Sequence, residues 1–222
     1  MPHPTILLDL QYLPCLQYWT KFIQYQSILL EQHENFVKSS YRNRCHIAGV
    51  NGSLRLSIPL AKGKNEQQNI RQVSLSNQDH WRSRHWHSIR SAYGNAPYWD
   101  YYADQLEPHF KTKTTNLFDF NYQLFQTIYQ LLGLTTGVHL TTEYQSTPSA
   151  NQILDFRAGI HPKPHRAKPD PHFQSIPYPQ VFSEKNGFLP NLSILDLLFC
   201  TGPEAPLLLE QMIVHEPTSK EG

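Results

Sequence analysis

The stretch TILLDLQYLPCLQYWTKFIQYQSILLE, residues 5–31, decides the fold class of this chain. Its opening run at 5–10 is mostly apolar and short, as expected of a buried strand. Between Leu13 and Tyr25 the apolar side chains recur near helical spacing, and the apolar run at 27–31 is too short for a helix. A strand, a helix and a second strand in this order make a crossover between parallel strands, which predicts an α/β sheet.

A β-hairpin is predicted next. The dipeptide Asn51–Gly52 tolerates the positive φ angles of a tight turn, and it separates RCHIAGV, residues 44–50, from SLRLSIPL, residues 53–60. Residues 69–76, NIRQVSLS, alternate like a further strand. Helical signals follow at 80–93, 97–110 and 117–134, with Asp79, Asn116 and Gly133 as the expected capping residues. We therefore expect a mixed sheet with helices packed around it.

The segment 147–180 stands apart because it is rich in proline. It follows a predicted strand at 138–144 and holds seven prolines. Proline lacks an amide donor and has a fixed φ angle, so the composition predicts a long loop, either mobile or covering a site. Two short helices are then predicted, at 190–200 and 203–214. The length of 222 residues suits a single domain spanning 1–222.

The composition describes a globular protein without a strong overall charge. Hydrophobic residues make up 39% of the chain, and 19 basic residues balance 18 acidic ones. A chain so close to neutral has no general field for nucleic acid or an anionic membrane. The early apolar run is interrupted at Asp9, and no later run reaches the length of a membrane span. Cys15, Cys45 and Cys200 form no metal-type pair, so we expect free thiols and a cytoplasmic location.

The stretch KSSYRNRC, residues 38–45, gathers a lysine and two arginines in a chain whose formal net charge is only +1. Cations this close repel one another unless a nearby anion neutralises them. If the hairpin strand begins early, Arg42 and Arg44 project from one face, where their flat guanidinium groups suit carboxylate or phosphate. The alternative is that both are tied to Glu31, Glu34 or a buried aspartate.

Asp196 is the aspartate expected to be buried. It lies in LSILDLLF, residues 192–199, where apolar side chains cover most directions around a helix. Removing the partner of a buried charge costs on the order of 3 to 5 kcal/mol. We therefore expect Arg42 or Arg44 to pair with Asp196, and a structural role is favoured over a catalytic one.

The segment HWRSRHWHSIR, residues 80–90, is the densest cluster of imidazoles. Its histidines lack the i, i+4 spacing of a metal-binding helix, so no metal site is predicted. Trp81 and His85 are four residues apart and share a helix face, where His85 could be a general base or part of a hydrogen-bonding wall. The alternative is a partly buried structural histidine. His161, His165 and His172 match no ligand spacing and are expected in a solvated loop.

A series of motifs runs through most of the chain. Between about Leu7 and Ala205 these are YLPCLQYWTKF, ENFVKSSYRNRCHI, LSIPL, W-x3-HW-x-SI, YPQVF and FLPNLSILDLLFCTGPEA. Taken together they resemble the WbqC-like protein family of bacteria. That resemblance implies a place in clusters for O-antigen and related surface polysaccharides. Some members of this largely uncharacterised family are suggested to transfer glycine or another small acyl group onto sugars.

One motif departs from the family pattern. Many members resemble His-Gln-Pro-x-Tyr-Leu-Pro-Trp at the first strand–helix junction, where this chain has Leu8-Asp9-Leu10-Gln11-Tyr12-Leu13-Pro14-Cys15. A mechanism that needs the histidine therefore does not carry over, although Asp9 could provide a carboxylate one residue on.

From the residues and the resemblance together we expect a transferase that uses an activated sugar or acyl donor, with no cofactor identified. Lys38, Arg42 and Arg44 would hold the donor or another small anionic ligand, and His85 and Asp196 are the catalytic candidates. The other residues expected to bind substrate are Tyr12, Tyr41, Asn43, Trp81, Tyr178 and Gln180. The alternative is a non-catalytic small-ligand-binding or scaffold protein, in which acidic neighbours occupy the cations.

Overall fold

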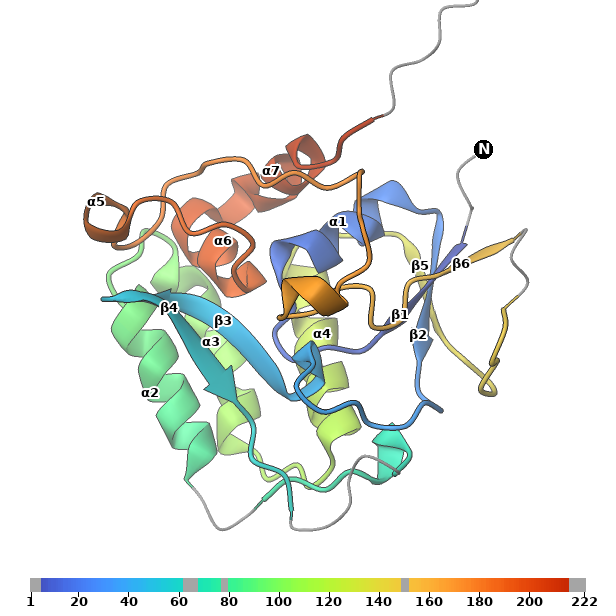
Figure 1. Ribbon diagram of the computed structural model, residues 1–222. Helices are drawn as coiled ribbons and strands as arrows, with labels where there is room; N and C mark the ends of the chain where they lie inside the picture. The colour runs from blue at the N-terminus through green and yellow to red at the C-terminus, as the bar shows by residue number, and fades with distance from the viewer. Residues whose placement is uncertain (1–4, 62–67, 77–79, 149–151, 216–222) are drawn as a thin grey trace, which may run out of the picture.

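A computed structural model describes residues 5–61, 68–76, 80–148 and 152–215 of the chain (Figure 1). Its larger sheet is parallel and has the strand order β5-β2-β1-β6. The strands are β1 Thr5–Asp9, β2 Ser27–Glu31, β5 Gly137–Leu140 and β6 Ile153–Asp155. The predicted α/β class is confirmed.

Helix α1, Leu16–Gln24, is the predicted crossover between β1 and β2. Trp19 and Phe22 on this helix are fully buried. Trp19 stacks on Phe125 of α4, Leu117–Leu131, with the ring centroids 5.4 Å apart. Because stacked aromatic rings bury large apolar areas, this contact holds α1 against α4 beside the sheet.

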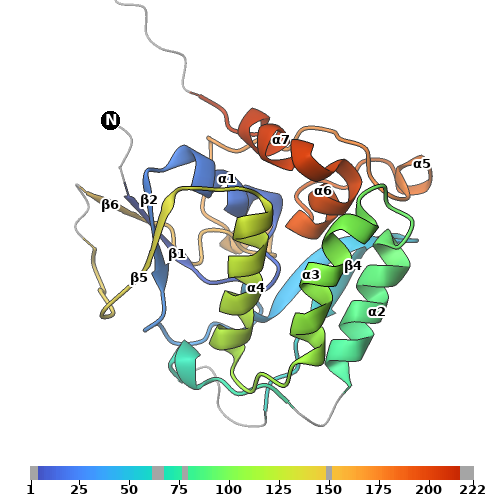
Figure 2. The ribbon, with the colours of Figure 1, turned by 180° about the vertical axis from the view of Figure 1, so that it is seen from behind.

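The hairpin predicted around Asn51–Gly52 forms a second, antiparallel sheet. Its strands are β3, Arg44–Gly49, and β4, Gly52–Ser57. Seen from behind, α2 and α3 lie in front of the hairpin and cover one of its faces (Figure 2). The helices on this side are α2 Trp81–Tyr93, α3 Trp99–Lys111 and α6 Ile194–Thr201. The Tyr93 hydroxyl of α2 accepts from the Ala48 N–H of β3 at 2.9 Å, which ties the two layers together.

Two predictions about regular structure are wrong. Residues 69–76 are not a strand, because the 3₁₀ helix η3, Ile70–Gln72, interrupts them and leaves isolated bridges at Asn69, Ser74 and Leu75. The proline-rich segment 147–180 is not free of regular structure, because β6 lies within it and pairs with β1.

The predicted caps of α4 are confirmed. The Asn116 side chain accepts from the Asp119 N–H, and Gly133 has a φ of +61° just beyond the helix. Asp79, the expected cap of α2, lies outside the described residues. The remaining short elements are η1 Tyr41–Asn43, η4 Pro164–Arg166, α5 Ser183–Asn186, η5 Gly202–Glu204 and α7 Ala205–Gln211.

Candidate functional site

Three neighbouring strands of the parallel sheet end in an acidic residue. Asp9 ends β1, Glu31 ends β2 and Asp155 ends β6. Asp9 and Glu31 are partners in the register of the two strands, and β6 lies on the other side of β1. Parallel strands present their carboxyl ends together, so the acids gather at one edge. Ligands of open α/β sheets bind at this edge.

Arg42 neutralises two carboxylates beside this edge and is 1% exposed. Its Nε and Nη2 donate to the two oxygens of Glu34, each at 2.6 Å, and its Nη1 lies 3.3 Å from Asp9 Oδ2. The Ala158 N–H donates to the other oxygen of Asp9 at 2.7 Å. Burial raises the pKa of Glu34 to about 7, although Arg42 acts in the opposite direction. Arg42 is therefore sealed by acids and does not face an external ligand.

Arg157 joins the other two acids of the edge. Its Nη1 donates to Glu31 at 3.0 Å, and its Nη2 donates to Asp155 at 2.6 Å. Burial raises the pKa of Asp155, but the hydrogen bonds from Arg157 outweigh this and hold it below its ordinary value. Asp9, Glu31, Glu34 and Asp155 thus face only two guanidinium groups in this network, which leaves an excess of carboxylate oxygens.

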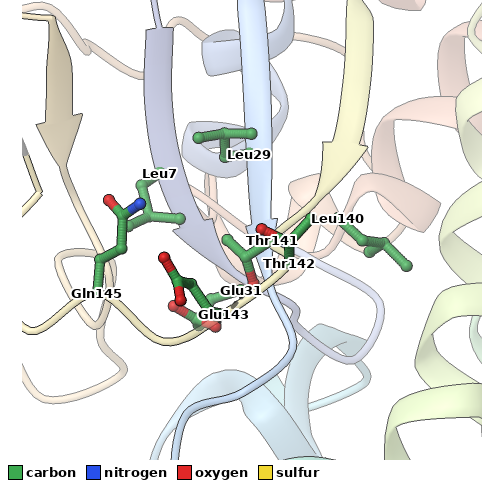
Figure 3. Close-up of a pocket in the computed structure, with 8 residues that line it drawn as sticks. All are labelled: Leu7, Leu29, Glu31, Leu140, Thr141, Thr142, Glu143 and Gln145. Carbon is green, nitrogen blue, oxygen red and sulfur yellow. Dashed lines mark hydrogen bonds between the residues drawn. The ribbon is translucent and has the colours of Figure 1, made fainter.

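A cavity of about 150 Å³ opens beside Glu31 at the same edge (Figure 3). Leu7, Leu29 and Leu140 form its apolar part. Its polar lining consists of Glu31, Thr141, Thr142, Glu143 and Gln145. The Thr141 hydroxyl donates to Glu31 at 2.8 Å and so fixes the carboxylate that faces the cavity. Hydroxyl, amide and carboxylate groups without a lining cation favour a ligand that donates hydrogen bonds, such as an alcohol or an ammonium group.

Two further polar side chains, the buried Gln11 and the half-buried His161, lie close to Asp9 and Arg42. Gln11 is 1% exposed, and its Oε1 has no hydrogen-bond partner among the described residues. The backbone N–H of Lys163 donates to His161 Nδ1 at 3.0 Å, so the ring proton lies on Nε2, which is also buried without a described partner. His161 is thus half-buried, whereas His165 in the same segment is exposed, as expected of a solvated loop.

The predicted catalytic residue His85 lies inside the molecule. Its Nδ1 is 2.9 Å from the Tyr12 hydroxyl, and its ring packs against Trp81 with centroids 5.2 Å apart. Burial lowers the pKa of His85 to about 4, so the imidazole is neutral near pH 7. The predicted pairing of Trp81 with His85 is confirmed, whereas the role of His85 as a base stays a prediction.

Asp196 is fully buried, as predicted, but its predicted arginine partner is wrong. Its Oδ2 accepts from the Tyr178 hydroxyl at 2.7 Å and from Gln180 Nε2 at 2.8 Å. Tyr93 is a further hydrogen-bond neighbour of this carboxylate, and burial raises the pKa of Asp196. Neutral donors satisfy Oδ2, whereas Oδ1 is buried without a hydrogen-bond partner among the described residues. The structure therefore joins Tyr178, Gln180 and Asp196 in one group away from the edge cavity. Catalysis by Asp196 stays a prediction.

The structure separates the predicted cations. Lys38 is exposed, Arg42 is buried and Arg44 is half-buried at the start of β3. Arg42 lies in the 3₁₀ helix η1 rather than in the strand, so the prediction that it shares a strand face with Arg44 is wrong. The alternative partner Glu34 is confirmed for Arg42 but not for Arg44. Among the other expected substrate residues, Asn43 donates to the Ile58 carbonyl at 3.0 Å and Tyr41 is buried.

Sequence reasoning missed Asp155, Arg157 and the residues that follow β5. One signal was available: ILD at 153–155 repeats the apolar-apolar-acid ending of the first strand, LLD at 7–9. The prolines around it concealed this likeness. No group of His, Cys, Asp and Glu side chains in the described parts of the chain is arranged to hold a metal ion.

These features define an α/β protein with a polar, acid-rich site at the carboxyl edge of a parallel sheet. Residues 11–162 match the model of the WbqC-like protein family, and the chain belongs to that family. It is 27% identical over 218 residues to the "Uncharacterized protein Rv1507c" of Mycobacterium tuberculosis (strain ATCC 25618 / H37Rv), with 88% of this chain and 92% of that protein covered. No solved structure matches the chain. Within the ranges described, none of the helices has the length and apolar character needed to cross a bilayer.

Proposed function

We infer that this chain is a transferase of surface-polysaccharide or O-antigen-type biosynthesis whose acceptor, a sugar or a small amino compound, binds at the carboxyl edge of the parallel sheet. The observation that carries this proposal is the cavity lined by Glu31, Glu143 and three uncharged polar side chains. Family membership and the position at the strand ends support it.

The lining favours an acceptor that donates hydrogen bonds. Carboxylates bind alcohol and ammonium groups directly, and Glu143 is exposed enough to meet an incoming ligand. A carboxylate beside an attacking hydroxyl or amine can also take up its proton as the new bond forms. The volume of about 150 Å³ is small, so the cavity suits one sugar unit or one amino acid rather than an extended chain.

Binding of simple acceptors tests the proposal. In calorimetric titrations, glucosamine and glycine should bind the wild type, and Glu143→Gln should weaken glucosamine binding roughly tenfold, because it removes one charge-assisted contact. Glu184→Gln, at an exposed acid on α5, is the matched control and should bind like the wild type. Incubation with acyl-CoA or nucleotide-sugar donors should then change the mass of the bound acceptor. Failure of every acceptor to bind would contradict the proposal.

A second candidate is a non-catalytic binding or scaffold protein. The sealing of Arg42 by Glu34 and Asp9 favours it, as does Leu8 at the position of the family histidine. This candidate predicts acceptor binding without a mass change for any donor. The mass measurement therefore separates the two functions.

A further inference from the structure

The outer face of the β3–β4 hairpin is polar at its open end, where β3 begins and β4 ends. Arg44 lies opposite Ser57 in the register, and His46 lies opposite Arg55. Side chains alternate along a strand, so these four share one face. The hairpin lies in front of α2 and α3 in Figure 1, with those helices on its opposite face. This outer face is distinct from the acid-rich edge cavity, whose lining includes none of these residues.

This face carries two positively charged side chains, Arg44 and Arg55, that no acidic side chain neutralises among the described residues. Neither Arg44 nor Arg55 forms an ion pair within the part of the chain that the structure describes. Arg44 is half-buried, and its Nε is a buried donor with no hydrogen-bond partner there. Burial, and then the neighbouring Arg55, lower the pKa of both Arg44 and His46. Arg42 and Arg157 differ from Arg44 and Arg55 because each of them forms ion pairs with acids.

The backbone beneath this face is held in place. The His46 carbonyl accepts from the Ser193 N–H at 2.7 Å, at the start of α6. The Tyr41 ring meets the His46 ring edge-on, with centroids 5.9 Å apart, and Tyr41 is itself buried. Cys45 and Ile47, on the opposite face of β3, are buried in the core. The cationic side chains therefore project from a fixed base, as a preformed site requires.

We propose that Arg44, His46, Arg55 and Ser57 form a binding site for a small phosphoryl anion on the outer face of the hairpin. A guanidinium group presents a flat fork of donors that matches two phosphoryl oxygens, and an anion between Arg44 and Arg55 removes their mutual repulsion. The unpartnered Nε of Arg44 gains an acceptor, and the Ser57 hydroxyl supplies a further donor. The phosphoryl group can belong to free pyrophosphate or to a nucleoside diphosphate.

Titration with inorganic pyrophosphate tests this site, with calorimetry for affinity and NMR of the imidazole for location. The wild type should bind pyrophosphate, the His46 ring resonances should shift, and added sodium chloride should weaken the binding. Arg55→Gln should reduce the affinity roughly tenfold, because one charge-assisted contact is lost. Arg55 is exposed, so this variant should keep the wild-type melting temperature. In a parallel titration, a nucleoside diphosphate should bind more tightly than pyrophosphate if the protein also contacts the nucleoside. It should bind equally tightly if the protein recognises the phosphoryl groups alone.

Two control variants make the outcome specific. Arg84→Gln removes an exposed arginine of α2 and should leave pyrophosphate binding unchanged. Glu143→Gln, which tests the acceptor cavity, should also leave pyrophosphate binding unchanged. The test of this site is therefore independent of the test of the proposed function. Equal losses in Arg55→Gln and Arg84→Gln, or pyrophosphate binding without any change at His46, would overturn the proposal.

Discussion

At the scale of single residues, buried titratable groups have two kinds of hydrogen-bond partner, neutral donors and a guanidinium group. Asp196 is surrounded by neutral donors, whereas Glu34 is held by a guanidinium group with two bonds of 2.6 Å. His85 belongs to the first kind, because its described side-chain partner is the Tyr12 hydroxyl. A group that is buried among neutral partners has a pKa far from its ordinary value, and this shift can be measured.

The His85 imidazole should couple stability to pH. Its pKa is about 4 in the folded chain against 6.5 for the free side chain. The unfolded chain therefore binds a proton more readily between these values, so the contribution of neutral His85 is complete above pH 6.5 and is lost as pH falls towards 4. The full contribution is about 3 kcal/mol.

Urea unfolding of His85→Gln and wild type across this range measures that contribution. The difference in unfolding free energy should shrink as the pH falls from 6.5 to 4. His87→Gln changes an exposed histidine of the same helix and should show no such trend. A constant difference for His85→Gln would mean that the imidazole binds its proton equally well in the folded and unfolded chains.

At the scale of elements, the sequence pattern predicted those helices and strands whose formation depends on neighbouring residues. The opening β-α-β unit and the hairpin were predicted because their signals lie within one short stretch. Strand β6 was not predicted, since it pairs with β1, whose Thr5 is far from its partner Ile153 in the sequence. The candidate site residues were likewise predictable only where neighbours in the sequence determine their surroundings. The burial of Asp196 followed from its neighbours in sequence, but its partner Tyr178 lies 18 residues away and depends on the fold.

An ion pair ties the proline-rich segment to helix α1. Lys21 Nζ lies 2.7 Å from Asp170 Oδ2, and the two side chains are 2% and 7% exposed. Gln17, one turn earlier in α1, also donates to Asp170 at 2.8 Å. Asp170→Asn should therefore destabilise the chain by about 3 to 5 kcal/mol, because it leaves Lys21 buried without its anion.

Urea unfolding and limited proteolysis check this tether together. Asp170→Asn should be cleaved faster within the proline-rich segment than wild type. Asp104→Asn, at an exposed acid of α3, is the control and should change neither measurement. If the two variants behaved alike, the proline-rich segment would be held by its other contacts, and the Lys21–Asp170 pair would not be its tether.

At the scale of the whole molecule, two buried groups act on stability in opposite directions. The pKa of Glu34 is about 7 in the folded chain against 4.5 for the free side chain. The folded chain therefore binds this proton more readily than the unfolded one, so the contribution of Glu34 is complete below pH 4.5 and is lost as pH rises towards 7. Between pH 4.5 and 6.5, Glu34 and His85 should largely cancel, each with a slope near 1.4 kcal/mol per pH unit.

A double-mutant cycle exposes the cancellation. Glu34→Gln leaves the His85 contribution unopposed, so its unfolding free energy should fall more steeply than that of wild type as the pH drops through this window. His85→Gln should show the reverse trend, and the double variant should follow the wild-type slope. Glu34→Gln also deprives Arg42 of its main partner, which lowers stability at every pH, so the slopes rather than the absolute values are compared. Parallel slopes in all four proteins would show that neither group titrates as its burial requires, and that Arg42 keeps Glu34 ionised throughout.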